Sequence, residues 1–252
     1  MGSFNKVDQP LIKIARKEID GFGHEVRHVF GYNPDVDSAA EETVWTAGGL
    51  YKHLESPTIL TVSSTSANDT SAGTGARTIY ILGINSTGGE VSETVILNGQ
   101  TAVNTTHTYT EIQSLRVLTA GTGLKNAGNI HVGFGTVTAG VPVTTYGHIL
   151  AGENQSLMGH ITIPLGYKGY IASGSISSGT EGGSNFITGR LKLRRNGILY
   201  TTALITFNNN QTSFDFHYPI ELLAGDCIQA SAESTANNEA VSCYFQVLLV
   251  KE

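Results

Sequence analysis

The 252-residue chain is long enough for one large or two ordinary β domains, and charged residues make up only 14% of it. Its 30 glycines favour tight turns over long helices. The net charge of −6 (15 basic minus 21 acidic residues) comes without a basic run, and no stretch has the length of a membrane span. This composition argues against nucleic-acid binding, docking on anionic lipid and insertion into a membrane.

Residues 1–57 form a segment with little periodicity, interrupted by glycines and prolines. We expect an N-terminal arm that has no core of its own and is ordered mainly by neighbouring subunits. In the isolated protein, residues 1–50 should then exchange amide hydrogens quickly and be cleaved by protease. The apolar side chains available for such contacts are Leu11, Ile12, Ile14, Ile19, Phe22, Val26, Val29 and Phe30.

The arm contains "HEVRH" (24–28), which satisfies the H-E-x-x-H signature of zinc metallopeptidases. That chemistry needs a helix, because only there do residues four apart bring both imidazoles to one zinc ion. The flanking glycines favour a strand, in which His24 and His28 lie about 13 Å apart. A zinc peptidase is therefore the third-ranked hypothesis, and we expect no bound zinc and no peptide cleavage.

The stretch "NPDVDSAAEE" (33–42) has Asn33, Asp35 and Asp37 at alternate positions. It lacks the glycine and the distal glutamate of an EF-hand loop, so it predicts a solvated turn rather than a calcium site. Further along, "LYKHL" (50–54) has room for a single helical turn.

From residue 58 to 145 the pattern indicates a first β-sandwich domain. The glycine-rich stretch 68–84 lacks the lysine of a phosphate-binding loop and leads into a strand, so it predicts a turn. The stretch 85–89 and the pair Asn98-Gly99 are expected to form hairpin turns. The expected strands are 58–62, 77–84, 90–97, 109–118 and 129–134.

Residues 146–252 indicate a second, C-terminal β domain. Asn196-Gly197 predicts a tight hairpin between two of its strands. Short strands at regular spacing with Gly and Asn turns are typical of a β-sandwich or jelly roll. The expected strands are 156–164, 168–176, 187–195, 198–207, 212–218, 226–232 and 240–250.

Catalytic patterns do not stand out in the sequence. It has no nucleophile elbow and no conspicuous carboxylate pair, so we expect a protein that is not an enzyme and holds no cofactor or metal. Cys227 and Cys243 are expected to be buried thiols rather than a disulfide. The aromatic residues Phe214, Phe216 and Tyr218 share one strand face and are expected to be core.

Three short stretches resemble a family of tailed-phage virion structural proteins, and the similarity extends over about residues 20–135. They read Asp-Thr-x-Ala-Gly-Thr-Gly-Ala-Arg-Thr (69–78), Ser-Glu-Thr-Val-x-Leu-Asn-Gly (92–99) and Asn-Ala-Gly-x-Ile (126–130). The resemblance implies a virion location on the capsid surface, with the major capsid protein as a partner.

The second domain resembles jelly-roll modules of the complement C1q and tumour-necrosis-factor type, through "ELLAGDCIQASA" (221–232) and the apolar strand after it. Such modules are usually trimers, which implies a homotrimer. The last strand is apolar on both faces, and one face is expected to meet a partner chain. That face carries Tyr244, Gln246, Leu248 and Val250.

The sequence thus predicts an all-β, non-enzymatic virion protein with two β-sandwich or jelly-roll domains and an extended N-terminal arm. The leading hypothesis is a capsid decoration or cement protein that stabilises a phage head through contacts between subunits. The alternative is a tail or head-fibre adhesin that binds a host surface glycan. The fold alone does not choose between these roles.

Overall fold

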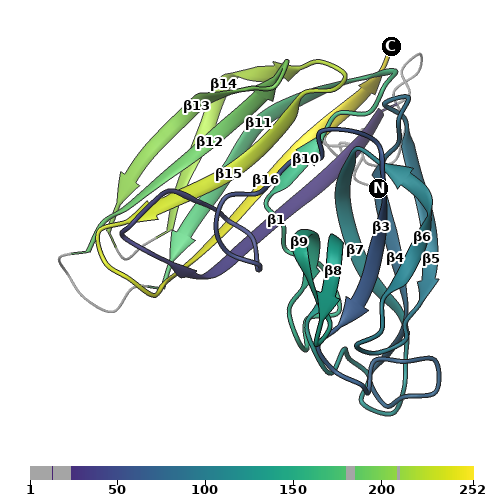
Figure 1. Cartoon of the computed structure of the whole chain (residues 1–252). Coiled ribbons are helices and arrows are strands. Elements are labelled where there is room, and N and C mark those ends of the chain that lie inside the picture. The colour runs from purple at the N-terminus through teal and green to yellow at the C-terminus, as the bar shows by residue number, and fades with distance from the viewer. Residues whose placement is uncertain (1–12, 14–23, 180–184, 209–210) are drawn as a thin grey trace, which may run out of the picture.

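A computed structural model describes Lys13 and residues 24–179, 185–208 and 211–252 of the protein (Figure 1). All of its regular elements are β-strands, β1 to β16, paired in antiparallel ladders. The predicted all-β class is confirmed. No helix in the described part of the chain could cross a bilayer.

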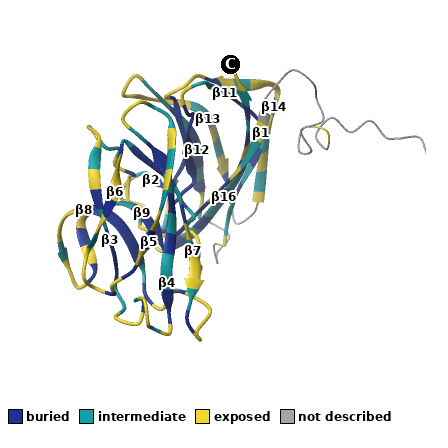
Figure 2. Cartoon of the chain, turned by 90° about the vertical axis from the view of Figure 1, so that its right-hand side faces the viewer, coloured by how far each residue is buried: buried dark blue, intermediate teal, exposed yellow. Residues whose placement is uncertain are grey.

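Two hydrophobic cores, each enclosed by two sheets, divide the described strands into two lobes (Figure 2). Lobe I has sheet 3, in the order β6-β3-β8-β9, and sheet 4, in the order β5-β4-β7. Its largest buried side chains include Tyr109, Ile79 and Leu60. The strands are β3 (Thr58–Ser64), β4 (Ala76–Ile84), β5 (Glu90–Ile96), β6 (Val103–Tyr109), β7 (Glu111–Ala120), β8 (Ile130–Thr138) and β9 (Val141–Ile149).

Lobe II has sheet 1, in the order β1-β16-β11-β14, and sheet 2, in the order β10-β15-β12-β13, with β2 paired to β15. Alternate residues of its strands point into one core, as in β12, where Ile187, Leu191 and Leu193 are buried. The strands are β1 (His24–Val36), β2 (Glu42–Thr43), β10 (His160–Thr162), β11 (Tyr167–Ser178), β12 (Ile187–Arg195), β13 (Ile198–Phe207), β14 (Gln211–Leu222), β15 (Cys227–Ser234) and β16 (Glu239–Lys251).

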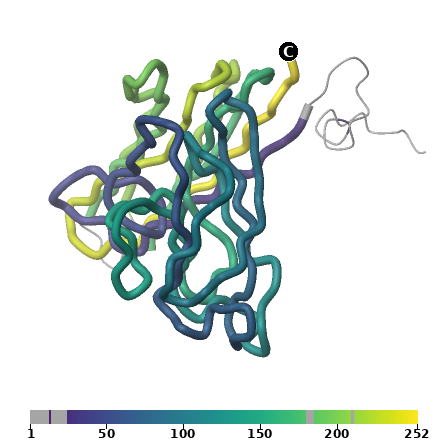
Figure 3. Tube along the Cα trace, turned by 45° about the vertical axis from the view of Figure 1, so that its right-hand side comes forward, coloured from purple at the N-terminus to yellow at the C-terminus, as the bar shows by residue number. Residues whose placement is uncertain are grey.

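The described part of the predicted arm belongs to the two lobes of its own chain, which corrects the arm hypothesis for residues 24–57. β1 pairs with β16 along most of its length, and Figure 3 shows β1 in purple beside the yellow C-terminal strand. Val36 and Val44 pack in the core of lobe II, while Trp45 and Tyr51 pack in that of lobe I. This segment folds on its own chain because the open edge of β16 offers it a complete ladder of backbone partners. Residues 1–12 and 14–23 lie outside the described residues.

The strand predictions are confirmed where hydrophobic alternation is strong, as at 187–195 and 198–207. Three strands, β2, β6 and β9, were missed, and β1 was expected as a strand only around residues 24–28. β6 is rich in threonine, and β9 contains Pro142, so neither has a clear apolar alternation. The helical turn expected at 50–54 is wrong. The segment has no regular structure, and its Tyr51 side chain is buried in the core of lobe I.

Two of the three predicted hairpin turns are confirmed. Asn196 and Gly197 have φ values of 53° and 78°, the left-handed pair of a type I′ turn. In the turn 85–89, the Asn85 side-chain oxygen accepts hydrogen bonds from the amides of Thr87 and Gly89. Asn98-Gly99 does not close a hairpin, because it connects β5 of sheet 4 to β6 of sheet 3.

Gly31 of β1 occupies a place where no side chain fits. A Cβ there would overlap the carbonyl oxygen of Val44 and lie 2.7 Å from the Cα of Gly159. We expect Gly31→Val to lower the free energy of unfolding by about 3 kcal/mol or more, because backbone on both sides must move. Urea denaturation measures it. Gly179→Val, at a position with open space around its Cβ, is the control and should change stability little. Equal stability of both variants would contradict this packing.

Candidate functional site

The four residues predicted to contact a partner lie on the outer face of sheet 1. Along β16, Cys243, Phe245, Val247 and Leu249 are buried in the core of lobe II, whereas Tyr244, Gln246, Leu248 and Val250 alternate to the other side. Gln246 is exposed and the other three are half-buried. The division of the strand into a core face and an outer face is therefore as predicted, and contact of this outer face with a partner stays a prediction.

Aromatic side chains of β1 extend the outer face. Phe30 lies opposite Tyr244 in the ladder, and their rings stack with centroids 4.9 Å apart. The Tyr244 hydroxyl lies 2.9 Å from Nδ1 of His28 and also accepts a hydrogen bond from the Gln246 amide. Phe30 remains 49% exposed, so this aromatic cluster is ordered but uncovered.

The "HEVRH" stretch lies on β1, in the strand conformation that the flanking glycines predicted. Val29 is buried in the core of lobe II, while His28 and Phe30 are exposed on the other side. A strand carries residues four apart about 13 Å from each other, too far for one metal ion. Across residues 24–179, 185–208 and 211–252, no three His, Cys, Asp or Glu side chains are grouped to hold a metal.

The acidic stretch 33–42 is only in part the solvated turn that the sequence indicated: residues 33–36 belong to β1, whereas residues 38–40 form an exposed bend. Asn33 is buried at the end of β1, and its amide donates to the Glu42 carboxylate and to the carbonyl of Thr43. Glu42 in turn accepts hydrogen bonds from the amides of Asp37 and Gly49. These contacts of Asn33 and Glu42 fix the chain where it leaves β1.

The stretches that carry the phage-protein resemblance meet at the buried carboxylate of Asp69. It accepts hydrogen bonds from the amides of Ala76 (2.7 Å), Ala127 (2.8 Å) and Gly128 (2.9 Å), and from the Ser64 hydroxyl (2.6 Å). The amide of Gly99 donates to the backbone carbonyl of Asp69 at 2.7 Å. Residues from 69–78, 92–99 and 126–130 thus share one hydrogen-bonded centre, and the glycine-rich loop serves this centre rather than a phosphate.

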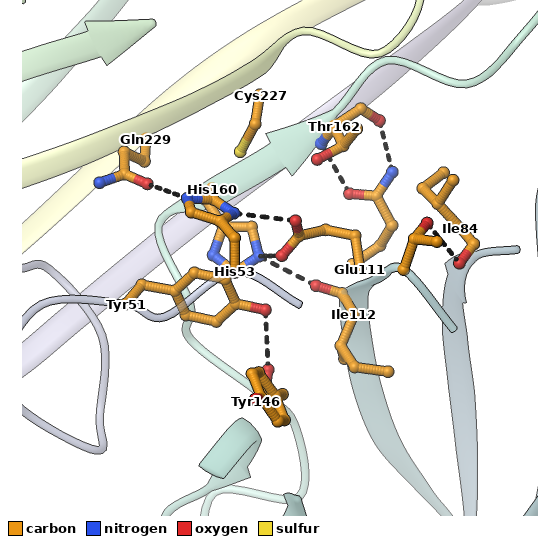
Figure 4. Close-up of polar contacts among 12 residues, drawn as sticks. Tyr51, His53, Ile84, Glu111, Ile112, Tyr146, His160, Thr162, Cys227 and Gln229 are labelled. Carbon is orange, nitrogen blue, oxygen red and sulfur yellow. Dashed lines mark hydrogen bonds and ion pairs between the residues drawn. The ribbon is translucent and has the colours of Figure 1, made fainter. Parts of the chain in front are cut away.

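A buried polar cluster joins the two lobes (Figure 4). Glu111 of β7 accepts a hydrogen bond from Nδ1 of His53 at 2.9 Å, and Nε2 of His53 lies 3.2 Å from the side-chain oxygen of Gln229 on β15. Nε2 of His160 on β10 donates to the carbonyl of Ile112 at 2.9 Å. The Glu111 contact joins the 51–53 connection to lobe I, and the Gln229 and Ile112 contacts join that connection and lobe I to lobe II. Together they fix how the lobes are joined.

A second pair of contacts strengthens this joint. The Gln113 side chain of β7 donates to the carbonyl of Thr162 at 2.5 Å and accepts from the Thr162 amide at 2.8 Å, which mimics a backbone ladder. Burial lowers the pKa of His160, and it raises the pKa of the nearby Cys227 thiol. The Cys227 thiol is protonated, and the His160 imidazole donates to a backbone carbonyl. Both properties favour a structural role over nucleophilic chemistry.

Two buried histidines face each other across β8 and β9 in lobe I. His131 pairs with His148 in the ladder, with ring centroids 4.8 Å apart. Burial lowers the pKa of His131 to about 4; burial and the neighbouring His131 lower that of His148 to about 3. His148 Nδ1 bonds the Thr46 hydroxyl at 2.7 Å, while Nε2 of His131 has no partner among the described residues. Both rings are therefore neutral at pH 7.

The cysteines are buried and unbridged, as predicted: Cys227 lies in sheet 2 and Cys243 in sheet 1. Burial raises the pKa of Cys243 to about 12. Phe214 and Phe216 pack against the core of lobe II, in agreement with the core prediction. Tyr218 is 83% exposed, which contradicts it. β14 is an edge strand, and its pairing with β11 shifts in register between Ile171 and Ser173, so the simple alternation does not reach Tyr218.

Sequence reasoning missed the joint between the lobes because its members come from four separate segments. One signal was present: in the strand 109–118, Glu111 and Gln113 share a face with Leu115. Polar residues on an apolar strand face indicate a buried polar contact. The alternation pattern does not show which residues elsewhere in the chain form that contact.

Comparison with known proteins gives no family. No protein-family model matches the chain, and neither does any curated protein. Among solved structures, the Gx strain of infectious bursal disease virus aligns with a TM-score of 0.26 and 7% identity, over 93% of this chain and 74% of that chain. A VP2 subviral particle of the same virus gives a TM-score of 0.23 and 9% identity, over 96% and 78%. Both TM-scores are too low for a shared fold and carry no argument about function.

Proposed function

We propose that the protein is a non-enzymatic structural component of a phage virion, and that it decorates the capsid. The observation that carries this proposal is the role of the resemblance stretches, whose residues hold loops together around Asp69. The buried histidines, carboxylates and thiols likewise form structural contacts. Such a chain is suited to bind other proteins through its surfaces.

The strand order of lobe II supports a jelly roll. If β1 and β10 to β16 are numbered one to eight along the chain, sheet 1 has the order one-eight-three-six and sheet 2 the order two-seven-four-five. This is the order of a jelly roll, a fold used in viral capsids and lectins. On this assignment lobe I is an insertion between the first and second strands, so the domains are nested rather than consecutive.

We further propose that the outer face of sheet 1 binds copies of the same chain in a trimer. Leu248 and Val250 of β16 are apolar and remain partly exposed in the single chain. Light scattering at micromolar concentration should give the mass of a trimer for the wild type. Leu248→Arg should give the mass of a monomer, because it would bury a charge at the contact. Leu204→Arg, on the distant β13, should remain trimeric. A monomeric wild type would contradict the proposal.

The location in the virion separates decoration from the adhesin alternative. A decoration protein should label tail-less heads in many copies, whereas a fibre adhesin should label a few vertices or the tail. Imaging of virions that carry a tagged copy of the chain tests this directly. Label confined to tails would overturn the decoration role and favour the adhesin.

A further inference from the structure

A groove of about 240 Å³ lies between the lobes, along the edge of β1 that faces away from β16. Arg27, His28 and Phe30 form one wall, Glu90 and Arg116 of sheet 4 form the other, and Gln155 lies on the segment that connects them. The ion pair between Arg27 and Glu90, at 2.8 Å, closes one side of it. Grooves at domain junctions with a few fixed polar groups are the usual places for small ligands.

Several hydrogen-bonding groups along the groove lack partners. Nε of Arg27 is buried and unpartnered within the described part of the chain. The Arg116 guanidinium lies 4.5 Å from the centroid of the Tyr80 ring, and it forms no ion pair with a described residue. The exposed Gln155 amide likewise bonds no described side chain. An ordered guanidinium on an aromatic ring and a free amide are well suited to bind hydroxyl groups.

The backbone of β1 adds further donors and acceptors. The Phe30 carbonyl accepts from the Gly159 amide at 3.0 Å, so the backbone groups of Phe30 point away from β16. Because these directions repeat every second residue along a strand, the amide and carbonyl of His28 also point to the groove side. Beside them the Phe30 ring, 49% exposed, supplies an apolar surface.

We propose that this groove binds a single neutral pyranose sugar. A sugar ring combines vicinal hydroxyls, which match the Arg116, Gln155 and His28 backbone groups, with an apolar C–H face that fits Phe30. Arg27 is paired with Glu90 of the lining and with Glu25 outside it, so the charge of Arg27, Arg116, Glu25 and Glu90 together is zero and an acidic ligand gains little net attraction. The volume lies below the roughly 300–1,000 Å³ of pockets for drug-sized ligands, which favours one sugar unit. The inference goes beyond the virion role and holds for either location.

Saturation-transfer NMR with the full chain tests the site, using the methyl glycosides of glucose, galactose and N-acetylglucosamine, with glucuronic acid as a charged comparison. A single sugar unit should bind with a Kd on the order of 1 mM. Arg116→Met and Gln155→Ala should each weaken binding about tenfold, because each removes hydroxyl partners. Phe30→Ala should weaken it as well. Arg194→Met, which changes an arginine of β12 outside the groove, should bind like the wild type.

Binding of at least one neutral glycoside that is lost in the groove variants supports the assignment. It is overturned if no neutral glycoside binds, if only glucuronic acid binds, or if the groove variants bind like the wild type. Arg116 and Gln155 are exposed, and unchanged Trp45 fluorescence confirms that lobe I, which carries Arg116, remains folded. Light scattering of the same samples reports the trimer separately, so a failure of the sugar site is distinguishable from a failure of the proposed assembly.

Discussion

Asp69→Ala should destabilise lobe I by about 4 kcal/mol or more, because buried hydrogen bonds to a charged acceptor contribute about 1.5–3 kcal/mol each and their donors remain buried. The substitution leaves three backbone amides and the Ser64 hydroxyl without their acceptor. Asp69→Asn should recover part of the lost stability, because the asparagine carbonyl oxygen still accepts hydrogen bonds. The recovery is incomplete because the asparagine NH2 group cannot accept from the donors that it faces.

Trp45 makes the measurement specific to one lobe. It is the single tryptophan of the chain, and it packs in the core of lobe I. Its fluorescence during urea denaturation therefore reports the unfolding of that lobe. Asp215→Ala, at an exposed position on β14 in lobe II, is the matched control and should leave the transition unchanged. A shift of less than about 1 kcal/mol for Asp69→Ala would contradict the role given to this carboxylate.

Lobe I should also lose stability steeply in mild acid through His131 and His148. Their folded-state pKa values of about 4 and about 3 lie below the ordinary value of 6.5, because burial disfavours the imidazolium. The unfolded chain therefore binds protons first. The stability is complete above about pH 7.5, begins to fall as the pH drops through 6.5, and continues to fall toward pH 3. At pH 5 the loss is about 2 kcal/mol for each histidine.

The pH dependence of the Trp45 transition between pH 7.5 and 5 measures this effect. The double variant His131→Gln/His148→Gln should lose about 4 kcal/mol less than the wild type over that range, even if it is less stable at pH 7.5. His107→Gln changes an exposed histidine of β6 and should keep the wild-type slope. Equal slopes for the double variant and the wild type would show that these rings do not control acid unfolding.

The candidate sites differ in how far the sequence could predict them. The outer face of β16 was predictable, because the side chains of one strand alternate and "SCYFQVLLV" is apolar on both faces. The joint around Glu111 and the groove beside β1 were not, because each brings together side chains from segments far apart in the chain. Arg116 and Gln155 meet only because residues 154–156 run beside β7.

The sequence by itself determined the all-β class, the strands 187–195 and 198–207, and the turn between them. These features depend on alternation and on Asn-Gly backbone preferences, which act within a few residues. Only the tertiary structure decided that the supposed arm supplies β1 to the second lobe, and that Asp69 gathers three distant stretches. The alternation of side chains predicts which face of a strand is buried. It does not predict the neighbouring strand, because any open sheet edge offers the same backbone donors and acceptors. The choice of β16 as the partner of β1 is made by the whole core that closes around them.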